Sequence, residues 1–208
     1  AIDAMTATSE KLAAMADYFK TASPSDAAIA AYFLSGQRVL RTVPTKLLYE
    51  MTLELIREKV SEPIREVHVV GGMHPHWPFE RYVEILEVIR DANPAAQIKA
   101  YTAVEIDFFA HLEKISLEEV FERLQAAGMR TMPGGGAEVF SERVRKALYQ
   151  EKIGHQRWLE IHEVAHGRGI RTNATLLYGH IETYRERVDH MLMLRELQDR
   201  TGGFLSFI

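Results

Sequence analysis

From residue 49 onward, helical and extended patterns alternate along the chain in a way that few folds accommodate. Each amphipathic segment of helical period is followed by a short apolar run. Such alternation predicts right-handed crossovers and a parallel α/β sheet, either doubly wound or curved into a barrel. The predicted helices cover 49–60, 79–91, 117–127, 156–168 and 183–200, and the strands after them cover 65–70, 97–102, 129–132, 170–177 and 204–208.

Glycines and polar residues mark several boundaries of these elements. Gly128, Gly169 and Gly202 each fall just after a predicted helix, where a left-handed C-cap is favoured. Ser116 and Glu119 form a predicted capping box at the start of helix 117–127. These local signals agree with the alternating pattern.

The segment before residue 49 has a different pattern, which predicts helical hairpins. Its two apolar stripes of helical period comprise Leu12, Met15, Tyr18 and Phe19, and then Ile29, Tyr32, Phe33 and Leu34. Ser23, Pro24 and Asp26 predict the start of the second helix, and Ser35 and Gly36 predict its end. We therefore divide the chain into a helical segment, 1–48, and an α/β unit, 49–208.

Composition restricts the chemistry more than it identifies it. The 208 residues carry a formal net charge of −4 with interleaved signs, which gives no basic footprint for nucleic acid. No apolar run is long enough to span a bilayer, and we expect a cytoplasmic protein. The chain has no cysteine, which excludes disulfides, a cysteine nucleophile and an iron–sulfur cluster held by its own thiolates.

The first candidate site follows the apolar run that begins at Val67. This run reads as a buried strand, and it ends in Gly71 and Gly72, with His74 and His76 directly after them. In parallel α/β folds, ligands bind outside the carboxyl ends of strands. The alternative is a plain tight turn, since a glycine pair is also typical of turns.

Other polar residues also follow predicted strands, so we expect them to converge on one face. They are Glu105 and Asp107, the sequence PGGGAE at 133–138, and the sequence YGHIE at 178–182. PGGGAE resembles an anion cradle, but it lacks the spacing of nucleotide-binding motifs. Its three glycines fit close approach to a flat or bulky ligand equally well.

The sequence HEVAH at 162–166 matches a helical zinc motif, with His162 and His166 one turn apart and Glu163 as the base. A third ligand is missing, because Thr172 stands where one metalloprotease class has histidine. A predicted strand also begins at Ile170, directly after the helix. We therefore interpret the segment as an amphipathic helix packed on the sheet and predict no metal site.

Five stretches in the α/β unit resemble, in order and spacing, the radical SAM enzymes of the futalosine route to menaquinone, and most of all the aminofutalosine synthases. They are EVHVVGGMHP, KAYTAVEIDFFA, PGGGAEVF, RTNATLLYGHIET and LRELQDRTGGF. The resemblance implies a partial parallel (β/α) radical SAM barrel, TIM-barrel-like, with an α-helical N-terminal appendage. It also implies S-adenosyl-L-methionine as cofactor and a small-molecule substrate. The implied transferase reaction adds a 5′-deoxyadenosyl radical to an enolpyruvyl-benzoate, with rearrangement and loss of carbon dioxide.

The same resemblance implies roles for particular residues. Gly71 and Gly72 would receive the methionine amino group, while Gly179 and Glu182 would lie near the adenine. The full set of implied cofactor residues is Gly71, Gly72, Glu105, Leu177, Gly179 and Glu182, and the implied substrate residues are His74, Glu138, Asn173 and His180.

The chain departs from this family where the cluster should bind. The family's CxxxCxxC loop should precede the helix near Tyr49, and this chain has RTVPTKLL there. The resemblance also implies that the first barrel strand is missing and that the chain ends within the sixth. We therefore expect no cluster, no turnover, feeble affinity for an adenosine-type ligand, and open sheet edges that favour self-association.

Residues 6–48 resemble the start of the N-terminal domain of ATP-dependent DNA ligases, without the family's adenylation motif. Two further hypotheses follow: a DNA-binding module, and an inert chimaeric domain. We expect nucleic-acid binding to be weak or absent, because acidic residues offset the basic ones. The basic residues are Lys11, Lys20, Arg38, Arg41 and Lys46, and the acidic ones are Asp3, Glu10, Asp17 and Asp26.

Overall fold

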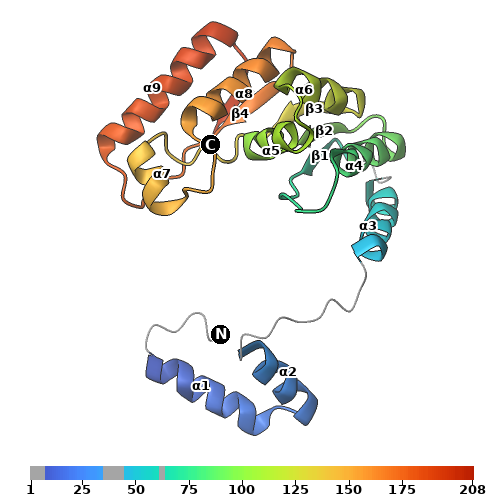
Figure 1. Cartoon of the computed structure of the whole chain (residues 1–208), viewed down its shortest axis with the longest axis vertical. Helices are drawn as coiled ribbons and strands as arrows, with labels where there is room; N and C mark the ends of the chain where they lie inside the picture. Colours follow the sequence, from blue (N-terminus) through green and yellow to red (C-terminus); the bar gives the residue numbers. More distant parts are fainter. Residues whose placement is uncertain (1–7, 35–44, 61–63) are drawn as a thin grey trace. The chain divides into compact units, whose positions relative to one another are not determined.

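The computed structural model describes residues 8–34, 45–60 and 64–208 (Figure 1). Contacts divide the chain into one unit of Ala1–Leu48 and another of Tyr49–Ile208. Among the helices that the structure describes, none has the length and apolarity needed to cross a bilayer.

The first unit contains α1 (Thr8–Thr21) and α2 (Pro24–Leu34). Ser23 caps the start of α2, because its Oγ accepts a hydrogen bond of 3.2 Å from the backbone N–H of Asp26. The predicted start of the second helix is thereby confirmed. Its predicted end at Ser35 and Gly36 lies outside the described residues.

A five-stranded parallel sheet forms the centre of the second unit (Figure 1). Its strands lie in sequence order, each parallel to the next. This order, with helical crossovers of one hand, is that of a partial barrel, whereas a doubly wound sheet reverses its order partway. The partial parallel barrel is therefore confirmed over the doubly wound alternative. The strands are β1 (Glu66–Val69), β2 (Gln97–Ala100), β3 (Met129–Met132), β4 (Arg171–Ala174) and β5 (Phe204–Phe207).

Helices pack on one face of this sheet and form the core with it. The described helices that follow α2 are α3 (Thr45–Val60), α4 (Phe79–Ala92), α5 (Ala103–Glu113), α6 (Leu117–Ala126), α7 (Glu142–Leu148), α8 (His155–Gly167) and α9 (Tyr184–Thr201). Ile98 and Ala100 of β2 are buried against α4, and Trp158 of α8 is fully buried. Ser116 caps α6 through a 3.2 Å bond from Glu119 N, and Gly128, Gly169 and Gly202 have the positive φ expected of them.

Two helices were not predicted, and one of them changes the site. Residues 103–113 form α5, where a strand-end loop containing Glu105 and Asp107 was expected. The signal was present in the sequence: Thr102 and Glu105 form a capping box, with the Glu105 side chain accepting from the Thr102 backbone N–H. Glu105 and Asp107 therefore project from the first turns of a helix rather than from a loop. The second unpredicted helix is α7.

Two β-bulges interrupt the register of the sheet. Ile98 pairs with Met129, but Lys99 pairs with Thr131, so that Arg130 is skipped. In the same way, Thr172 pairs with Phe204 and Asn173 with Ser206, so that Leu205 is skipped. Each bulge changes which side chain of the strand faces away from the helices.

Candidate functional site

A cavity of about 330 Å³ lies at the carboxyl ends of β1, β2 and β3. Its lining residues are Val70, Gly71, Gly72, Met73, Thr102, Val104, Glu105, Gly136 and Lys152. A groove of similar size, about 350 Å³, lies between α9 and β5, but it is lined mainly by apolar side chains. The strand-end cavity is the better candidate because a carboxylate, an ammonium group and three glycines line it.

Glu105 connects the two loops that form this cavity. Its Oε1 accepts hydrogen bonds from the backbone N–H groups of Gly71 (2.9 Å) and Gly72 (3.1 Å), and its Oε2 accepts one of 2.8 Å from Thr102 N. The side chain is only 5 % exposed. Because both glycine amides are already bound, the pair can offer its carbonyl oxygens to a ligand that carries donors, such as an ammonium group.

Gly71 and Gly72 are open on the side where a side chain would stand. No heavy atom lies within 4 Å of an ideal Cβ on either residue. Gly72 has a φ of +69°, a conformation that favours glycine. The following loop is held by the Tyr82 hydroxyl, which accepts a 2.8 Å bond from His74 N, and burial raises the pKa of Tyr82. The glycine pair is therefore fixed in position yet unobstructed.

The glycines at 134–136 serve packing instead of ligand approach. A Cβ on Gly134 would lie 2.4 Å from the backbone oxygen of Asn173, and one on Gly136 would lie 2.5 Å from Cγ2 of Val104. The carbonyl oxygen of Gly134 accepts a 2.6 Å bond from Thr175 Oγ1, and that of Gly135 accepts one from the Trp158 indole. Protein atoms therefore occupy the space that the sequence analysis left to an anion or a flat ligand.

Glu138 and Lys152 form an ion pair beside the cavity. Glu138 has a φ of +49°, which is uncommon for a residue other than glycine, and its side chain is largely covered. Its Oε1 accepts a hydrogen bond from Lys152 Nζ, and Lys152 itself lines the cavity. The backbone of Glu138 also accepts a 3.0 Å bond from Leu177 N, which joins the loops after β3 and β4. Sequence reasoning missed Lys152, because it lies in a turn beyond α7.

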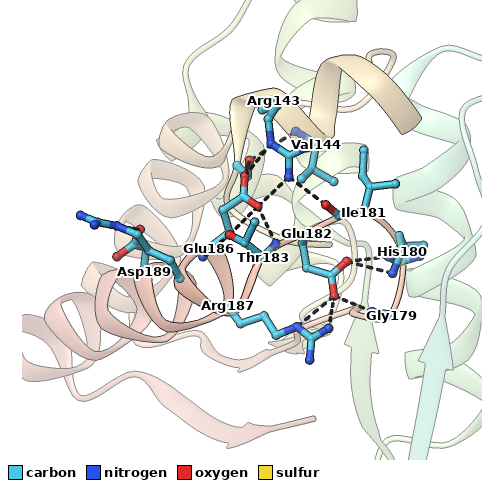
Figure 2. A network of polar contacts seen from close by, with 12 residues as sticks. Arg143, Val144, Gly179, His180, Ile181, Glu182, Thr183, Glu186, Arg187 and Asp189 are labelled. Carbon is cyan, nitrogen blue, oxygen red and sulfur yellow. Dashed lines mark hydrogen bonds and ion pairs between the residues drawn. The ribbon is translucent and has the colours of Figure 1, made fainter.

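The turn at 178–182 forms a separate polar network, which Figure 2 shows. The Glu182 carboxylate accepts hydrogen bonds from Gly179 N (2.6 Å), His180 N (2.8 Å) and the Arg187 guanidinium (2.9 Å). These bonds lower the pKa of Glu182 to about 2, and the bond from Gly179 has the largest effect. The carboxylate is covered by its own turn although the turn lies at the periphery of the molecule.

Glu186 belongs to the same network and lies in the first turn of α9. Its carboxylate accepts hydrogen bonds from Arg143, Ser141 and the backbone of Thr183 (Figure 2). The bond from Arg143 is the main reason that the pKa of Glu186 is well below its usual range. Gly179, His180 and Glu182 are not among the residues that line the strand-end cavity, and Leu177 is 52 % exposed.

His74 and Asn173 also lie outside the cavity lining. The His74 ring stacks on Trp77 with centroids 4.9 Å apart, and its Nδ1 accepts a bond from His76 N. The Asn173 side chain donates to Ser206 Oγ on β5. Of the residues assigned by resemblance, the structure thus brings Gly71, Gly72 and Glu105 together in one cavity.

The HEVAH segment is a packing helix, as interpreted from the sequence. His162 Nδ1 and His166 Nε2 both hydrogen-bond to Thr172 Oγ1, at 2.8 and 2.9 Å, and Glu163 pairs with Arg200. Burial lowers the pKa of His166 to about 4 and holds the pKa of His162 well below its usual range. In the part of the chain that the structure describes, no three acidic or histidine side chains are grouped to hold a metal ion.

Comparison with known proteins gives a family match over most of the chain. The model of the Radical SAM superfamily matches residues 35–194. An aminodeoxyfutalosine synthase of Thermus thermophilus is 48% identical over 153 residues, covering 74% of this chain and 41% of that protein. An aminodeoxyfutalosine synthase of Streptomyces coelicolor is 41% identical over 159 residues, covering 76% of this chain and 41% of that protein.

A third relative is named for a different activity. The cyclic dehypoxanthine futalosine synthase of Streptomyces coelicolor is 39% identical over 168 residues, covering 79% of this chain and 42% of that protein. The chain therefore spans about two fifths of the length of these relatives.

Proposed function

Since the chain belongs to the radical SAM superfamily, we propose that the cavity at the ends of β1, β2 and β3 binds the S-adenosyl-L-methionine of an aminofutalosine synthase-type barrel. The observation that carries this proposal is the glycine pair at 71 and 72. It is open to the cavity, and its amides are already bound to Glu105, so its carbonyl oxygens are left for the ammonium group of a methionine moiety.

The iron–sulfur cluster of the family does not fit this chain. Its thiolate ligands would be cysteines, and the 208 residues contain none. We therefore assign to this chain the binding of the adenosyl ligand and no reductive cleavage of it. Two relatives are named aminodeoxyfutalosine synthases. The enolpyruvyl-benzoate substrate and the other roles inferred by resemblance, such as that of Glu182 near the adenine, are part of this proposal.

A calorimetric titration of the full chain with S-adenosyl-L-methionine tests the proposal. We expect weak saturable binding, and a loss of at least tenfold in affinity for Gly71→Val, because a side chain there would enter the cavity. Gly167→Ala, at an open position in α8, is the matched control and should leave the affinity unchanged. Absence of binding to the unsubstituted chain would overturn the proposal.

Anaerobic treatment with iron and sulfide tests the second part. We expect no stoichiometric iron and no 5′-deoxyadenosine when a strong reductant is added, because the chain lacks thiolates. Iron at one cluster per chain together with 5′-deoxyadenosine would show that other side chains replace the cysteines, and the assignment of binding alone would be wrong.

The DNA-binding hypothesis depends on the first 48 residues. In the described part of that segment Lys20 pairs with Asp17 at 3.2 Å, which reduces the charge available to phosphates. Tight, salt-dependent binding of duplex DNA that is abolished by charge reversal at Arg38 and Arg41 would favour this hypothesis over the proposal above.

A further inference from the structure

The sheet has a second face, opposite the helices, and its side chains are polar. Ile98 and Ala100 of β2 point into the core, so by alternation Gln97 and Lys99 point the other way. Lys99 pairs with His68 of β1 in the register, so the His68 side chain lies on the same face. The interiors of closed barrels are usually filled by branched apolar side chains. Charged groups at these positions therefore make this face better suited to a polar ligand than to an apolar core.

The two bulges place hydroxyl groups on this face. Without the bulge in β3, Lys99 would pair with Arg130, but the observed register pairs it with Thr131. The bulge in β5 likewise brings Ser206 opposite Asn173. Bulges recur beside functional sites because they redirect a side chain. Two bulges that each bring a hydroxyl to the same face are an independent sign of recognition there.

A row of polar side chains crosses four strands on this face. The register joins His68 to Lys99, Lys99 to Thr131, and Thr131 to Arg171. Thr172 bonds to His162 of α8 on the helical face, which places Arg171 on the opposite one. Lys99 and Arg171 are two strands apart, roughly 10 Å between backbones at the usual strand spacing. Thr131 lies on the strand between those of the two cations, and its hydroxyl accepts a 3.4 Å bond from Gln97 Nε2.

The two cations of the row differ in their surroundings. Lys99 Nζ lies 3.1 Å from Glu66 Oε1, its side chain is 13 % exposed, and Glu66 is also bonded to His68. Among the residues that the structure describes, Arg171 has no ion-pair partner, and it is exposed. The row therefore carries one positive charge more than its acid balances.

We infer that this row is a carboxylate-binding subsite, in which Arg171 and Lys99 hold a small dianionic ligand and Thr131 donates or accepts a hydrogen bond between them. Guanidinium and ammonium groups are the usual partners of carboxylates in proteins. The inference rests on the proposed function only in expecting a small-molecule substrate for this unit, since Lys99, Thr131 and Arg171 do not line the strand-end cavity. It names the residues that would determine selectivity for a dicarboxylate.

Isophthalate, a rigid aromatic dicarboxylate, is a direct probe for the full chain. We expect saturable binding by NMR titration of backbone amides, and a loss of at least tenfold in affinity for both Arg171→Met and Lys99→Met. Arg130→Met is the matched control, because the bulge excludes that arginine from the row, and it should change the affinity less than twofold. Benzoate should bind more weakly, and the neutral isophthalamide should not bind.

Two further measurements distinguish failure of the subsite from poor folding of a variant and from failure of the proposed adenosyl-ligand binding. Arg171→Lys retains the charge and should recover part of the affinity, which decides the case if Arg171→Met folds poorly. S-Adenosyl-L-methionine binding should persist in Arg171→Met. Isophthalate binding that depends on Arg171 and Lys99 supports the subsite even if the adenosyl ligand fails to bind. Equal affinities in the wild type and in both methionine variants, or an equal loss in Arg130→Met, would overturn the subsite.

Discussion

Two glycine segments follow β1 and β3, which flank β2 in the sheet, and their surroundings differ completely. Gly71 and Gly72 have no protein atom within 4 Å of an added Cβ, whereas Gly134 would meet the backbone of β4 and Gly136 the side chain of Val104. The sequence of the second segment looks more like a ligand loop, because it has three consecutive glycines. The difference teaches that a glycine run indicates close approach, and that the approaching partner can be the protein itself.

The largest expected effect is on the packed segment. Gly134→Ala would place its Cβ 2.4 Å from the Asn173 oxygen, and backbone atoms of a central strand cannot easily withdraw. We expect a loss of about 3 kcal/mol or more in the free energy of unfolding, at the upper end of overpacking effects. Urea denaturation measures it. Gly167→Ala serves as the control, and equal stability of the two variants would remove the distinction between the segments.

The second-largest expected effect is a fall in the free energy of unfolding at acid pH, through a histidine that holds the packed segment. Phe140, which follows it, donates its N–H to His190 Nδ1, and His190 Nε2 donates to Thr175 O, so the ring is neutral. Burial lowers the pKa of His190 to about 4. The unfolded chain takes up the proton near pH 6.5, so this contribution is present above that pH and is lost as pH falls toward 4. We expect on the order of 2 kcal/mol between pH 7 and 4.5.

His190→Gln isolates this contribution. The buried His162 and His166 also have lowered pKa values, so the variant should keep part of the acid dependence. Denaturation at pH 7, 5.5 and 4.5 should give a shallower decline than in the wild type. An unchanged slope would mean that His190 does not anchor this segment.

The open segment should depend on Glu105. Glu105→Gln keeps the size of the side chain but replaces one amide-binding oxygen with a donor, which would oppose a backbone N–H. We expect a loss of about 2 kcal/mol, typical of hydrogen bonds to a buried charge. Hydrogen exchange at Gly71 and Gly72 should accelerate beyond the global change in stability. If exchange at these amides changed only as much as global stability does, the Glu105 side chain would not be what holds the glycine loop.

The smallest expected effect on stability is at the open glycines themselves. Gly71→Ala should stay within about 0.5 kcal/mol of the wild type, as at an unconstrained surface position. Gly72→Ala should lose about 1 kcal/mol, because its φ of +69° disfavours a side chain. Thermal denaturation gives both values. If Gly71→Ala proved as damaging as Gly134→Ala, the first segment would also serve packing.

The elements were largely predictable from local patterns, but their arrangement was predictable only through the family resemblance. The strand at 129–132 and the helix at 79–91 follow from local periodicity, which records burial of one face. Periodicity contains no information about strand order and left the barrel and the doubly wound sheet equivalent; the resemblance to the radical SAM enzymes is what predicted the barrel. α5 was missed because Glu105 was interpreted as a strand-end acid, although Thr102 three residues earlier completed a capping box.

The site was predictable only in part, because cavities depend on residues from separate segments. Gly71 and Gly72 stand at the end of a recognisable strand, which is why the sequence located them. Lys152 comes to the same cavity from a turn more than a dozen residues after β3, and no local pattern indicates that contact. The acid Glu182 was assigned to a ligand, yet its own turn provides its hydrogen bonds.

The bonds from Glu105 to the glycine pair have a consequence for affinity. They fasten the loop after β1 to the first turn of α5, so both move as one rigid piece. A ligand that docks there does not have to order a flexible loop, and the associated loss of conformational entropy has already occurred on folding. Even a few contacts can then give measurable binding, and the association rate should approach that of a preformed surface rather than that of a closing lid.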